Sequence, residues 1–351
     1  MRAYIPLPHG LSATTWAERH HRGEVPDASP YGLHKLADHG VDVTFGEVAP
    51  GRIVERVAAS VRYRTSGLEL VEGLLTARVR RHADVVVAYD ERTGVPAALR
   101  AARHRPTVLG IGWLTNRVAA PRLHAALAHR ALLRAASVFT QCEPVLPILH
   151  QEWGVPRSRL HYVPVGIDTD FYAVQPDPEP GSVVVASAGE DRYRDHALLV
   201  AAVSRLRTSH PGIHLELATG LPVHLPEELG TLYRGRLDGK MRELYRRSSV
   251  VAVALKPTVS GSGLTVALEA MASGRPLVMT DNPGVDAYVE HGVTGLLVPP
   301  GDVDAFAAAI GQLLSDPARR AEMGAAAAIR ARERFTSSVM AAHLAALARA
   351  A

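Results

Sequence analysis

Apolar runs that alternate with helical segments are the feature that most limits how this chain can fold. In the sequence, strands are expected at 83–89, 107–112, 137–140, 183–186, 250–255 and 276–280. Helical patterns separate them, and further helices are expected at 303–314 and from Ala318 to the end, with a break near Phe335. Strands that alternate with helices are typical of parallel sheets covered by helices, so the sequence predicts an α/β fold.

The chain length and one boundary indicate two domains. A chain of 351 residues exceeds the usual size of a single domain. A stretch rich in Pro, Gln, Asp and Glu at 174–181 follows the segment 163–171, and the strand and helix alternation then starts again. We therefore predict two doubly wound, Rossmann-like domains that face each other across a cleft, one over 1–167 and one over 168–335.

The composition excludes several classes of protein. Apolar residues make up 47% and aromatic residues 5% of the chain, which is typical of a globular protein. No apolar run resembles a signal peptide or a membrane span, and we expect a cytoplasmic protein. Cys142 is the single cysteine, which excludes an internal disulfide and a cysteine-based zinc site.

Charge is distributed unevenly between the two halves. Residues 1–167 contain 21 basic and 14 acidic residues, and residues 168–351 contain 18 and 21. Two amphipathic helices rich in arginine are expected on either side of 65–67. These features indicate either contact with an anionic acceptor or membrane surface, or an ordinary solvated surface.

The stretch Lys256–Asp281 reads as a loop, a helix, a turn and a strand. Ser260-Gly261-Ser262-Gly263 is a glycine-rich loop that allows a ligand close to the backbone. The helix that follows would present its first N–H groups to an anion, such as a phosphate. Glu269 lies on the next turn, at a position that suits a ribose diol. The alternative is an ordinary βα unit with a solvated Glu269.

In the first half, four residues follow predicted strands. His9 and Gly10 follow the strand at 2–8, and Asp90 and Glu91 follow the strand at 83–89. Ligands of open α/β sheets bind at the carboxyl ends of the strands. These residues are therefore candidates for the cleft, and the alternative is that they have no role in binding.

Three motifs resemble a known family. They are VPVGIDTDF at 163–171, LTVALEAMASGRP at 264–276 and GVTGLLVPPGD at 292–302. Their order and spacing resemble the retaining glycosyltransferases of family 4, which have the GT-B fold. The motifs cover the second half of the chain, and the first half is similar in architecture alone.

The resemblance implies a nucleotide-sugar donor held by the second domain and an acceptor held by the first. It also implies that the last helix, 336–351, crosses back to the first domain. In this family the second glutamate of an E-x7-E motif binds the donor ribose, and here it is Glu269. The loop before it, with Ser262, Gly263, Leu264 and Thr265, would approach the diphosphate and the sugar. Gly10 of the first domain is a further candidate for binding the nucleotide sugar.

The sequence departs from the family pattern in three places. Gly261 stands where the first glutamate of the motif belongs, which leaves open how the donor sugar is held. Where the family has an arginine and, five residues later, a lysine, this chain has Gly189 and Arg194, and Arg192 is a candidate for the missing charge. The family's histidine after the strand at 107–112 is absent.

The predicted reaction is transfer of a hexose from a nucleoside-diphosphate sugar to an acceptor hydroxyl. Arg192, Arg194, Lys256 and the amides at 261–264 would neutralise the departing diphosphate. Arginine suits this role because its planar fork binds phosphate through two hydrogen bonds. The backbone near Arg236 would read the donor base. No protein-bound metal is expected, and a Mg²⁺ ion that bridges the diphosphate stays open.

Other functions are also compatible with these patterns. A nucleotide-sugar epimerase, a phosphorylase, and an inactive module that binds the donor are the alternatives on the same fold. An oxidoreductase is disfavoured because no G-x-G-x-x-G opens a helix after a strand. Nucleic-acid binding is disfavoured because the basic regions lack interleaved aromatic residues. The sequence does not identify the donor (a UDP-, GDP- or dTDP-sugar), the acceptor, the catalytic residue of the first domain or the oligomeric state.

Overall fold

The structure is a computed structural model that describes residues 1–351 except 49, 102–104, 177, 179–180, 182 and 236. Residue contacts divide the chain into two compact units. Unit 1 consists of Met1–Arg22, Asp27–Gly166 and Ser337–Ala351, and unit 2 consists of Gly23–Pro26 and Ile167–Thr336. The short segment Gly23–Pro26 therefore belongs to unit 2, although both of its neighbours in sequence belong to unit 1. Sequence analysis did not anticipate this exchange.

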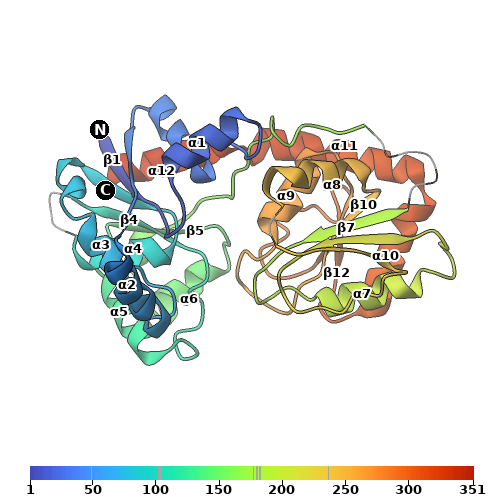
Figure 1. Ribbon diagram of the computed structural model, residues 1–351, viewed down its shortest axis with the longest axis horizontal. Helices are drawn as coiled ribbons and strands as arrows, with labels where there is room; N and C mark the ends of the chain where they lie inside the picture. The colour runs from blue at the N-terminus through green and yellow to red at the C-terminus, as the bar shows by residue number, and fades with distance from the viewer. Residues whose placement is uncertain (49, 102–104, 177, 179–180, 182, 236) are drawn as a thin grey trace. The chain divides into compact units, whose positions relative to one another are not determined.

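Each unit contains one parallel sheet of six strands with helices on its faces (Figure 1). The spatial order in unit 1 is β2 (Asp42–Gly46), β1 (Arg2–Pro6), β3 (Val85–Ala88), β4 (Thr107–Ile111), β5 (Ser137–Thr140) and β6 (Leu160–Tyr162). Every residue of β3, β4 and β5 is buried, as expected for strands covered by helices on both sides. The predicted α/β class with two doubly wound domains is confirmed.

The helices of unit 1 alternate with its strands along the chain. They are α1 (Ala13–His21), α2 (Arg52–Arg64), α3 (Leu70–Leu75), α4 (Glu91–Leu99), α5 (Arg122–Leu132), α6 (Val145–Gln151) and the 3₁₀ segments η1 (Pro30–His39), η2 (Val79–His82) and η3 (Arg157–Arg159). Ser12 caps helix α1, since its side chain accepts a hydrogen bond from the Thr15 N–H. Segment η1 is not one regular helix, since Tyr31 and Gly32 within it adopt positive φ.

Helix α12 (Ser337–Ala350) completes unit 1, although it follows unit 2 in sequence. Its buried face carries Met340, Ala341, Leu344, Ala345 and Ala348, at the three- and four-residue spacing of one helix face. These side chains pack in one core cluster with residues of β1, β3 and η1. The break before α12 falls at residues 335–336, as the sequence predicted.

Unit 2 has the spatial strand order β12 (Leu296–Val298), β11 (Leu277–Thr280), β10 (Val250–Val253), β7 (Val184–Ala188), β8 (His214–Ala218) and β9 (Gly230–Tyr233). Its helices are α7 (His196–Arg205), α8 (Met241–Arg247), α9 (Leu264–Ala272), α10 (Val303–Ser315), α11 (Pro317–Arg334) and the 3₁₀ segment η4 (Asp238–Lys240). Arg236, near which the backbone was expected to read the donor base, lies outside the described residues.

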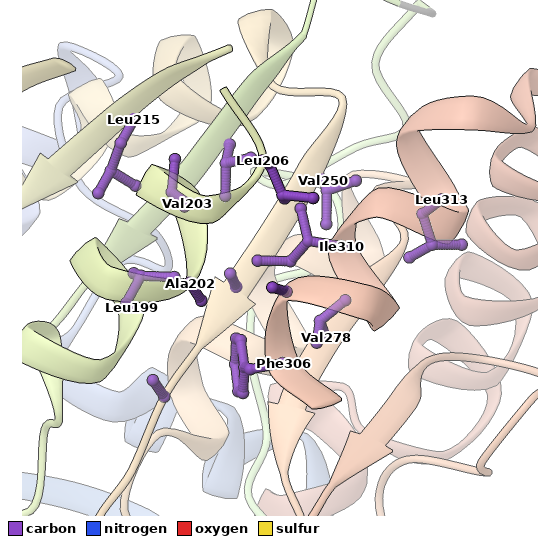
Figure 2. Packing of buried hydrophobic residues seen from close by; sticks show 14 of the residues in the cluster. Leu199, Ala202, Val203, Leu206, Leu215, Val250, Val278, Phe306, Ile310 and Leu313 are labelled. Carbon is purple, nitrogen blue, oxygen red and sulfur yellow. The ribbon is translucent and has the colours of Figure 1, made fainter. Parts of the chain in front are cut away.

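The core of unit 2 is largely aliphatic on one face of the sheet. Figure 2 shows Val203 of α7, Leu206 directly after α7, and Ile310 and Phe306 of α10 gathered over strands β10 and β11. Phe306 and Ile310 are fully buried, since they lie one helical turn apart on the inner face of α10. This packing fixes the strand ends from which the loops of the candidate site emerge.

Among the described residues, no helix combines the length and the apolar character that crossing a bilayer needs.

Candidate active site

The strand order of unit 2 places one pair of loops at a position typical of ligand sites. Strands β7 and β10 are neighbours, and the chain runs outward in opposite directions from them, so the switch in strand order lies between the two. Ligands of open parallel sheets bind beyond the carboxyl ends of the strands at such a switch. The loop 189–195 follows β7 and the loop 254–263 follows β10. The Lys256 N–H donates to the Tyr193 carbonyl at 2.8 Å, which joins the two loops.

Asp191 connects the arginine loop to the glycine-rich loop. Its Oδ2 accepts a hydrogen bond from Nε of Arg194 at 2.8 Å, and its Oδ1 accepts one from Oγ of Ser262 at 2.7 Å. Arg194 is 8% exposed, and its buried Nη1 has no hydrogen-bond partner among the described residues. A buried cationic donor without a partner is costly unless an acceptor arrives. Arg194 therefore has an unused donor at the switch point.

Gly189 makes the space that Arg194 occupies. A Cβ at Gly189 would overlap the Arg194 guanidinium, and the φ of 148° there favours glycine. The Gly189 carbonyl accepts hydrogen bonds from Oγ1 of Thr219 at 2.7 Å and Nε2 of His196 at 3.1 Å. Burial lowers the pKa of His196, so the ring stays neutral and Nε2 carries the proton. The backbone under Arg194 is thus held from two sides.

Helix α9 begins directly after the glycine-rich loop. Its N-cap is Gly263, with a φ of 81°, and no side chain of the described residues caps the helix. The first N–H groups of a helix have no acceptor within the helix, and the helix dipole favours an anion at that end. Ser262 and Leu264 are buried and Thr265 is exposed. The helix start can therefore bind a phosphate through its backbone.

Glu269 is held by two buried tyrosines. The Tyr245 hydroxyl donates to Oε2 of Glu269 at 2.7 Å, and the Tyr172 hydroxyl also hydrogen-bonds this carboxylate. Burial, and then the negative charge of Glu269, raise the pKa of both tyrosines well above the usual range. Both hydroxyls therefore stay protonated and orient a half-buried carboxylate, which keeps further acceptor capacity for a ligand.

The remaining predicted donor-site residues lie at the surface of the same loops. Arg192 is exposed, stacks on the Tyr193 ring with 4.9 Å between Cζ and the ring centroid, and donates to its hydroxyl at 2.9 Å. Lys256 is exposed, and its carbonyl accepts a hydrogen bond from the Asn282 side chain. Gly261 is half-buried and precedes Ser262 in the loop. The side chains of Arg192 and Lys256 can reach solvent, in contrast to that of Arg194.

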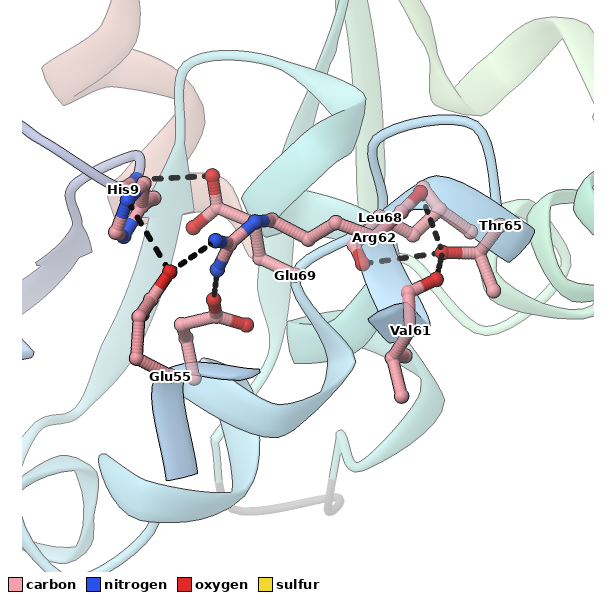
Figure 3. Close-up of polar contacts among 8 residues, drawn as sticks. His9, Glu55, Val61, Arg62, Thr65, Leu68 and Glu69 are labelled. Atoms are coloured by element: carbon pink, nitrogen blue, oxygen red, sulfur yellow. Dashed lines mark hydrogen bonds and ion pairs between the residues drawn. The ribbon is translucent and has the colours of Figure 1, made fainter. Parts of the chain in front are cut away.

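The candidates of unit 1 lie in a network of carboxylates and arginines. The His9 N–H donates to Oε1 of Glu69 at 2.9 Å, and Nε2 of His9 lies 3.5 Å from Oε1 of Glu55. Figure 3 shows Arg62 reaching from the other side toward Glu55. The neighbouring Gly10 is exposed, with a φ of 83° and open space around its Cα. His9 thus contacts the carboxylates of Glu69 and Glu55 at the carboxyl end of β1.

Asp90 and Glu91 have structural partners within unit 1. Asp90 caps α4 by accepting the Arg92 N–H at 2.9 Å and also pairs with the Arg92 side chain. Glu91 is buried, and its two oxygens accept the N–H groups of Gly112 at 2.9 Å and Trp113 at 2.8 Å. Burial raises the pKa of Glu91. These contacts order the loop after β4.

Glu69 has the most unusual environment in this network. It is 4% exposed, and its Oε2 is buried without a hydrogen-bond partner in the described part of the chain. Burial, together with the negative charge of Glu72, raises the pKa of Glu69 to about 7, although the hydrogen bond from His9 acts in the opposite direction. This carboxyl therefore titrates near neutral pH.

Several residues of the site escaped sequence analysis. They are Asp191, Tyr172, Tyr245, Thr219, His196 and Asn282 in unit 2 and Glu69 in unit 1. Apart from His196, each contacts a partner distant in sequence, so spacing along the chain gave no signal. For Asp191, a sign was its place in the same short loop as Arg192 and Arg194.

Comparisons with known proteins show similarity to glycosyltransferases. Residues 180–316 match the family described as group 1 glycosyl transferases. A D-inositol 3-phosphate glycosyltransferase from Kribbella flavida is 37% identical over 161 residues, which cover 44% of this chain and 36% of that protein. A GDP-mannose-dependent alpha-(1-6)-phosphatidylinositol monomannoside mannosyltransferase from Mycolicibacterium smegmatis is 30% identical over 197 residues, which cover 49% of this chain and 51% of that protein. The matches thus span about half or less of these relatives.

Solved structures match over nearly the whole chain. HepE from Anabaena, in complex with UDP-glucose, has a TM-score of 0.70 and 17% identity and matches 99% of this chain and 98% of its own. Sucrose-phosphate synthase from Thermosynechococcus elongatus has a TM-score of 0.72 and 17% identity with the same coverage. The fold is therefore GT-B, as predicted. With the family match over residues 180–316, unit 2 is similar to glycosyltransferases of family 4, as its motifs indicated.

Proposed function

We propose that this chain transfers a hexosyl group from a nucleoside-diphosphate sugar to an acceptor hydroxyl, with retention at the anomeric carbon. Arg194 carries the proposal. Its guanidinium lies at the switch point of unit 2 with a buried, unpartnered Nη1, and Asp191 links it to the loop that opens α9. A diphosphate would receive hydrogen bonds from this side chain and from the helix start.

The proposed reaction exchanges one bond at the anomeric carbon of the donor sugar for another. The bond from the anomeric carbon to the leaving phosphate oxygen breaks, and a bond from that carbon to the acceptor oxygen forms on the same face. The acceptor proton passes to the leaving phosphate. Arg194, with Arg192 and Lys256 at the rim, stabilises the charge on that phosphate. Glu269 binds the ribose hydroxyls of the donor.

The first experiment is calorimetric titration of the whole chain with UDP, GDP, ADP and dTDP, with and without Mg²⁺. HepE was solved with UDP-glucose and the mycobacterial relative is named for GDP-mannose, so UDP and GDP are the first two ligands. We expect saturable binding of one nucleotide. Binding of none of the four would contradict a donor site around Arg194 and Glu269.

The stereochemical part of the proposal needs a separate measurement. Once a donor and an acceptor are paired, proton NMR of the first product formed reports the anomeric configuration. We expect the configuration of the donor. An inverted product would contradict retention while it leaves the donor site intact. The epimerase alternative is not favoured, since the relatives named above are glycosyltransferases or a sugar-phosphate synthase.

We also propose that unit 1 binds the acceptor and contacts an anionic membrane surface through α2. Ile53 is 79% exposed and Val57 is 53% exposed on this arginine-rich helix, and exposed apolar and cationic side chains on one helix are typical of interfacial helices. We expect sedimentation with anionic vesicles that decreases with salt and in the I53S/V57S double variant. Equal sedimentation of the variant would contradict this contact.

A further inference from the structure

A pocket lined by arginines lies in unit 1, away from the strand ends discussed above. It has a volume of about 260 Å³, and Arg80, Arg81, Arg100, Arg105 and Thr107 line it. Thr107 is the first residue of β4, Arg80 and Arg81 belong to η2, and Arg100 follows the last residue of α4. The pocket is therefore at the amino ends of β3 and β4. His9, Asp90 and Glu91 lie at the opposite, carboxyl edge of this sheet.

The positive charge of this pocket is not balanced within the described residues. No carboxylate in that part of the chain forms an ion pair with any of the four arginines. Arg80, which is 8% exposed, reaches the Gly73 carbonyl at 3.4 Å, and Arg105 reaches the Arg80 carbonyl at 3.5 Å. These acceptors are neutral. Burial, and then the charges of Arg100 and Arg105, lower the pKa of Arg80. An anion would relieve this repulsion.

Two buried polar atoms at the pocket also lack partners. Oγ1 of Thr107, a residue with 0% exposure, and Nε of Arg105 have no hydrogen-bond partner in the part of the chain that the structure describes. A buried donor without a partner costs about 1–3 kcal/mol. One ligand that carries several acceptor oxygens would satisfy both atoms. This is a second observation, independent of charge, that points to an oxyanion.

We propose that this pocket binds a phosphate group, at a site separate from the donor site of unit 2. Guanidinium groups match phosphate oxygens through paired hydrogen bonds. The volume lies just below the range of about 300–1,000 Å³ for pockets that take drug-sized ligands, so it suits a phosphate or a small phosphomonoester. Leu74, Leu75 and Val79, which flank the arginines, are about half exposed. The phosphate can thus come from solution or from a lipid headgroup.

The test uses calorimetric titration of the whole chain with inorganic phosphate. The double variant R81Q/R100Q removes two exposed arginines of the pocket, and R130Q removes an exposed arginine of α5 as the matched control. We expect saturable binding to wild type, at least a tenfold weaker affinity in R81Q/R100Q, and unchanged affinity in R130Q. The separate variant T107V replaces the buried hydroxyl by a methyl group of similar size. It should also bind phosphate more weakly than wild type.

The donor-site variant R194Q separates this site from the proposed function. Phosphate affinity that is lost in R194Q and kept in R81Q/R100Q would place phosphate at the donor site and overturn the proposal. Absence of saturable binding to wild type, or equal weakening in R130Q, would also overturn it. Neither result bears on nucleotide binding or transfer, which are measured separately.

A vesicle experiment distinguishes the two sources of phosphate. Vesicles of phosphatidylcholine with phosphatidic acid carry a terminal phosphomonoester, and vesicles with phosphatidylglycerol carry a diester of the same sign of charge. A lipid headgroup would be assigned if the protein sediments with the phosphatidic acid vesicles and not with the phosphatidylglycerol vesicles. This sedimentation should decrease in R81Q/R100Q and on addition of inorganic phosphate. Saturable binding of inorganic phosphate with no preference between the vesicles would assign a soluble phosphate. Both results support the site.

Discussion

At the scale of single residues, the candidate donor site depends on side chains that are held before any ligand arrives. Asp191 positions Arg194 and Ser262, and two buried tyrosines position Glu269. A charged side chain that is already fixed loses less conformational entropy on binding than a free one. Such residues should therefore show larger effects on substitution than exposed neighbours of the same type.

Glu269 offers the first test of this expectation. The substitution Glu269→Ala removes the carboxylate proposed to accept the ribose hydroxyls. We expect the affinity for the nucleoside diphosphate to fall by about 1–3 kcal/mol, the range for charged hydrogen bonds left unmade. Calorimetry measures this, with Glu243→Ala, an exposed glutamate of α8, as the control. Equal affinities of the two variants would contradict the ribose assignment.

Arg194 and Arg192 form a natural pair for comparison. Arg194 is buried with an unpartnered Nη1, and Arg192 is exposed against Tyr193. We expect Arg194→Gln to lower the transfer rate by about 10²–10³, the usual effect of losing one stabilising donor in a site. Arg192→Gln should lower it by less. Initial-rate assays measure this effect. Near wild-type rates for both variants would contradict a role of either arginine in stabilising the leaving diphosphate.

Glu69 should make the stability of unit 1 depend on pH. Its pKa in the folded protein is about 7, above the value of 4.5 for a free glutamate. The folded state thus binds more protons between these values, and stability falls as pH rises from about 4.5 to 7 and stays lower above 7. Asp90 and Glu72 raise this pKa, and Arg92 lowers it.

The variant Glu69→Gln tests this titration. Glutamine cannot ionise, so we expect a gain on the order of 2–3 kcal/mol at pH 8 and little change at pH 5. Urea unfolding followed by tryptophan fluorescence measures it, and Glu18→Gln, an exposed glutamate of α1, is the control. A gain of the same size at both pH values would show that Glu69 is not the titrating group.

At the scale of elements, the start of α9 requires a glycine for two reasons. Gly263 has a φ of 81°, and a Cβ there would lie 2.8 Å from Cγ1 of Val253. Gly292 has a similar φ of 78° but open space around its Cα. The first position therefore combines backbone strain with crowding, and the second has backbone strain alone.

The pair of variants Gly263→Ala and Gly292→Ala separates these two costs. We expect Gly292→Ala to lower the free energy of unfolding by about 1–2 kcal/mol, the cost of the left-handed conformation. Gly263→Ala should lower it by more, because Val253 lies in the core of the sheet and cannot move freely. Urea unfolding followed by far-UV circular dichroism compares them. Equal losses would mean that crowding at Gly263 contributes nothing.

At the scale of the whole molecule, unit 1 depends on a helix from the far end of the chain. Helix α12 contributes five buried side chains to the core cluster around β1 and η1. Without it, that cluster would be exposed on one side, which costs about 25 cal/mol for each Å² of apolar surface. The core of unit 1 is therefore completed by a helix that follows unit 2 in the sequence.

Removal of residues 337–351 should destabilise unit 1 alone. The three tryptophans of the chain, Trp16, Trp113 and Trp153, all belong to unit 1, so their fluorescence reports its unfolding. We expect a lower unfolding midpoint by fluorescence, and unchanged affinity of unit 2 for its nucleotide. An unchanged fluorescence midpoint would show that unit 1 is stable without α12.

The sequence by itself determined the fold class and the start of the helix that follows the glycine-rich loop. Runs such as Val85–Ala88 and Leu277–Thr280 are fully buried strands, and periodicity reveals them because burial on both faces demands apolar residues throughout. Gly263 and Leu264 bound α9 where the pattern predicted its start. These features depend on neighbours along the chain, which a pattern can show.

Only the tertiary structure decided which residues distant in sequence contact one another. The sequence did not show that Gly189 makes room for the Arg194 guanidinium, that Tyr245 reaches Glu269, or that Gly23–Pro26 belongs to unit 2. It showed Arg80, Arg81, Arg100 and Arg105 as separate surface charges, and the fold gathers them around one pocket. Partners in these cases are distant in sequence, and burial and pKa depend on those partners rather than on local pattern.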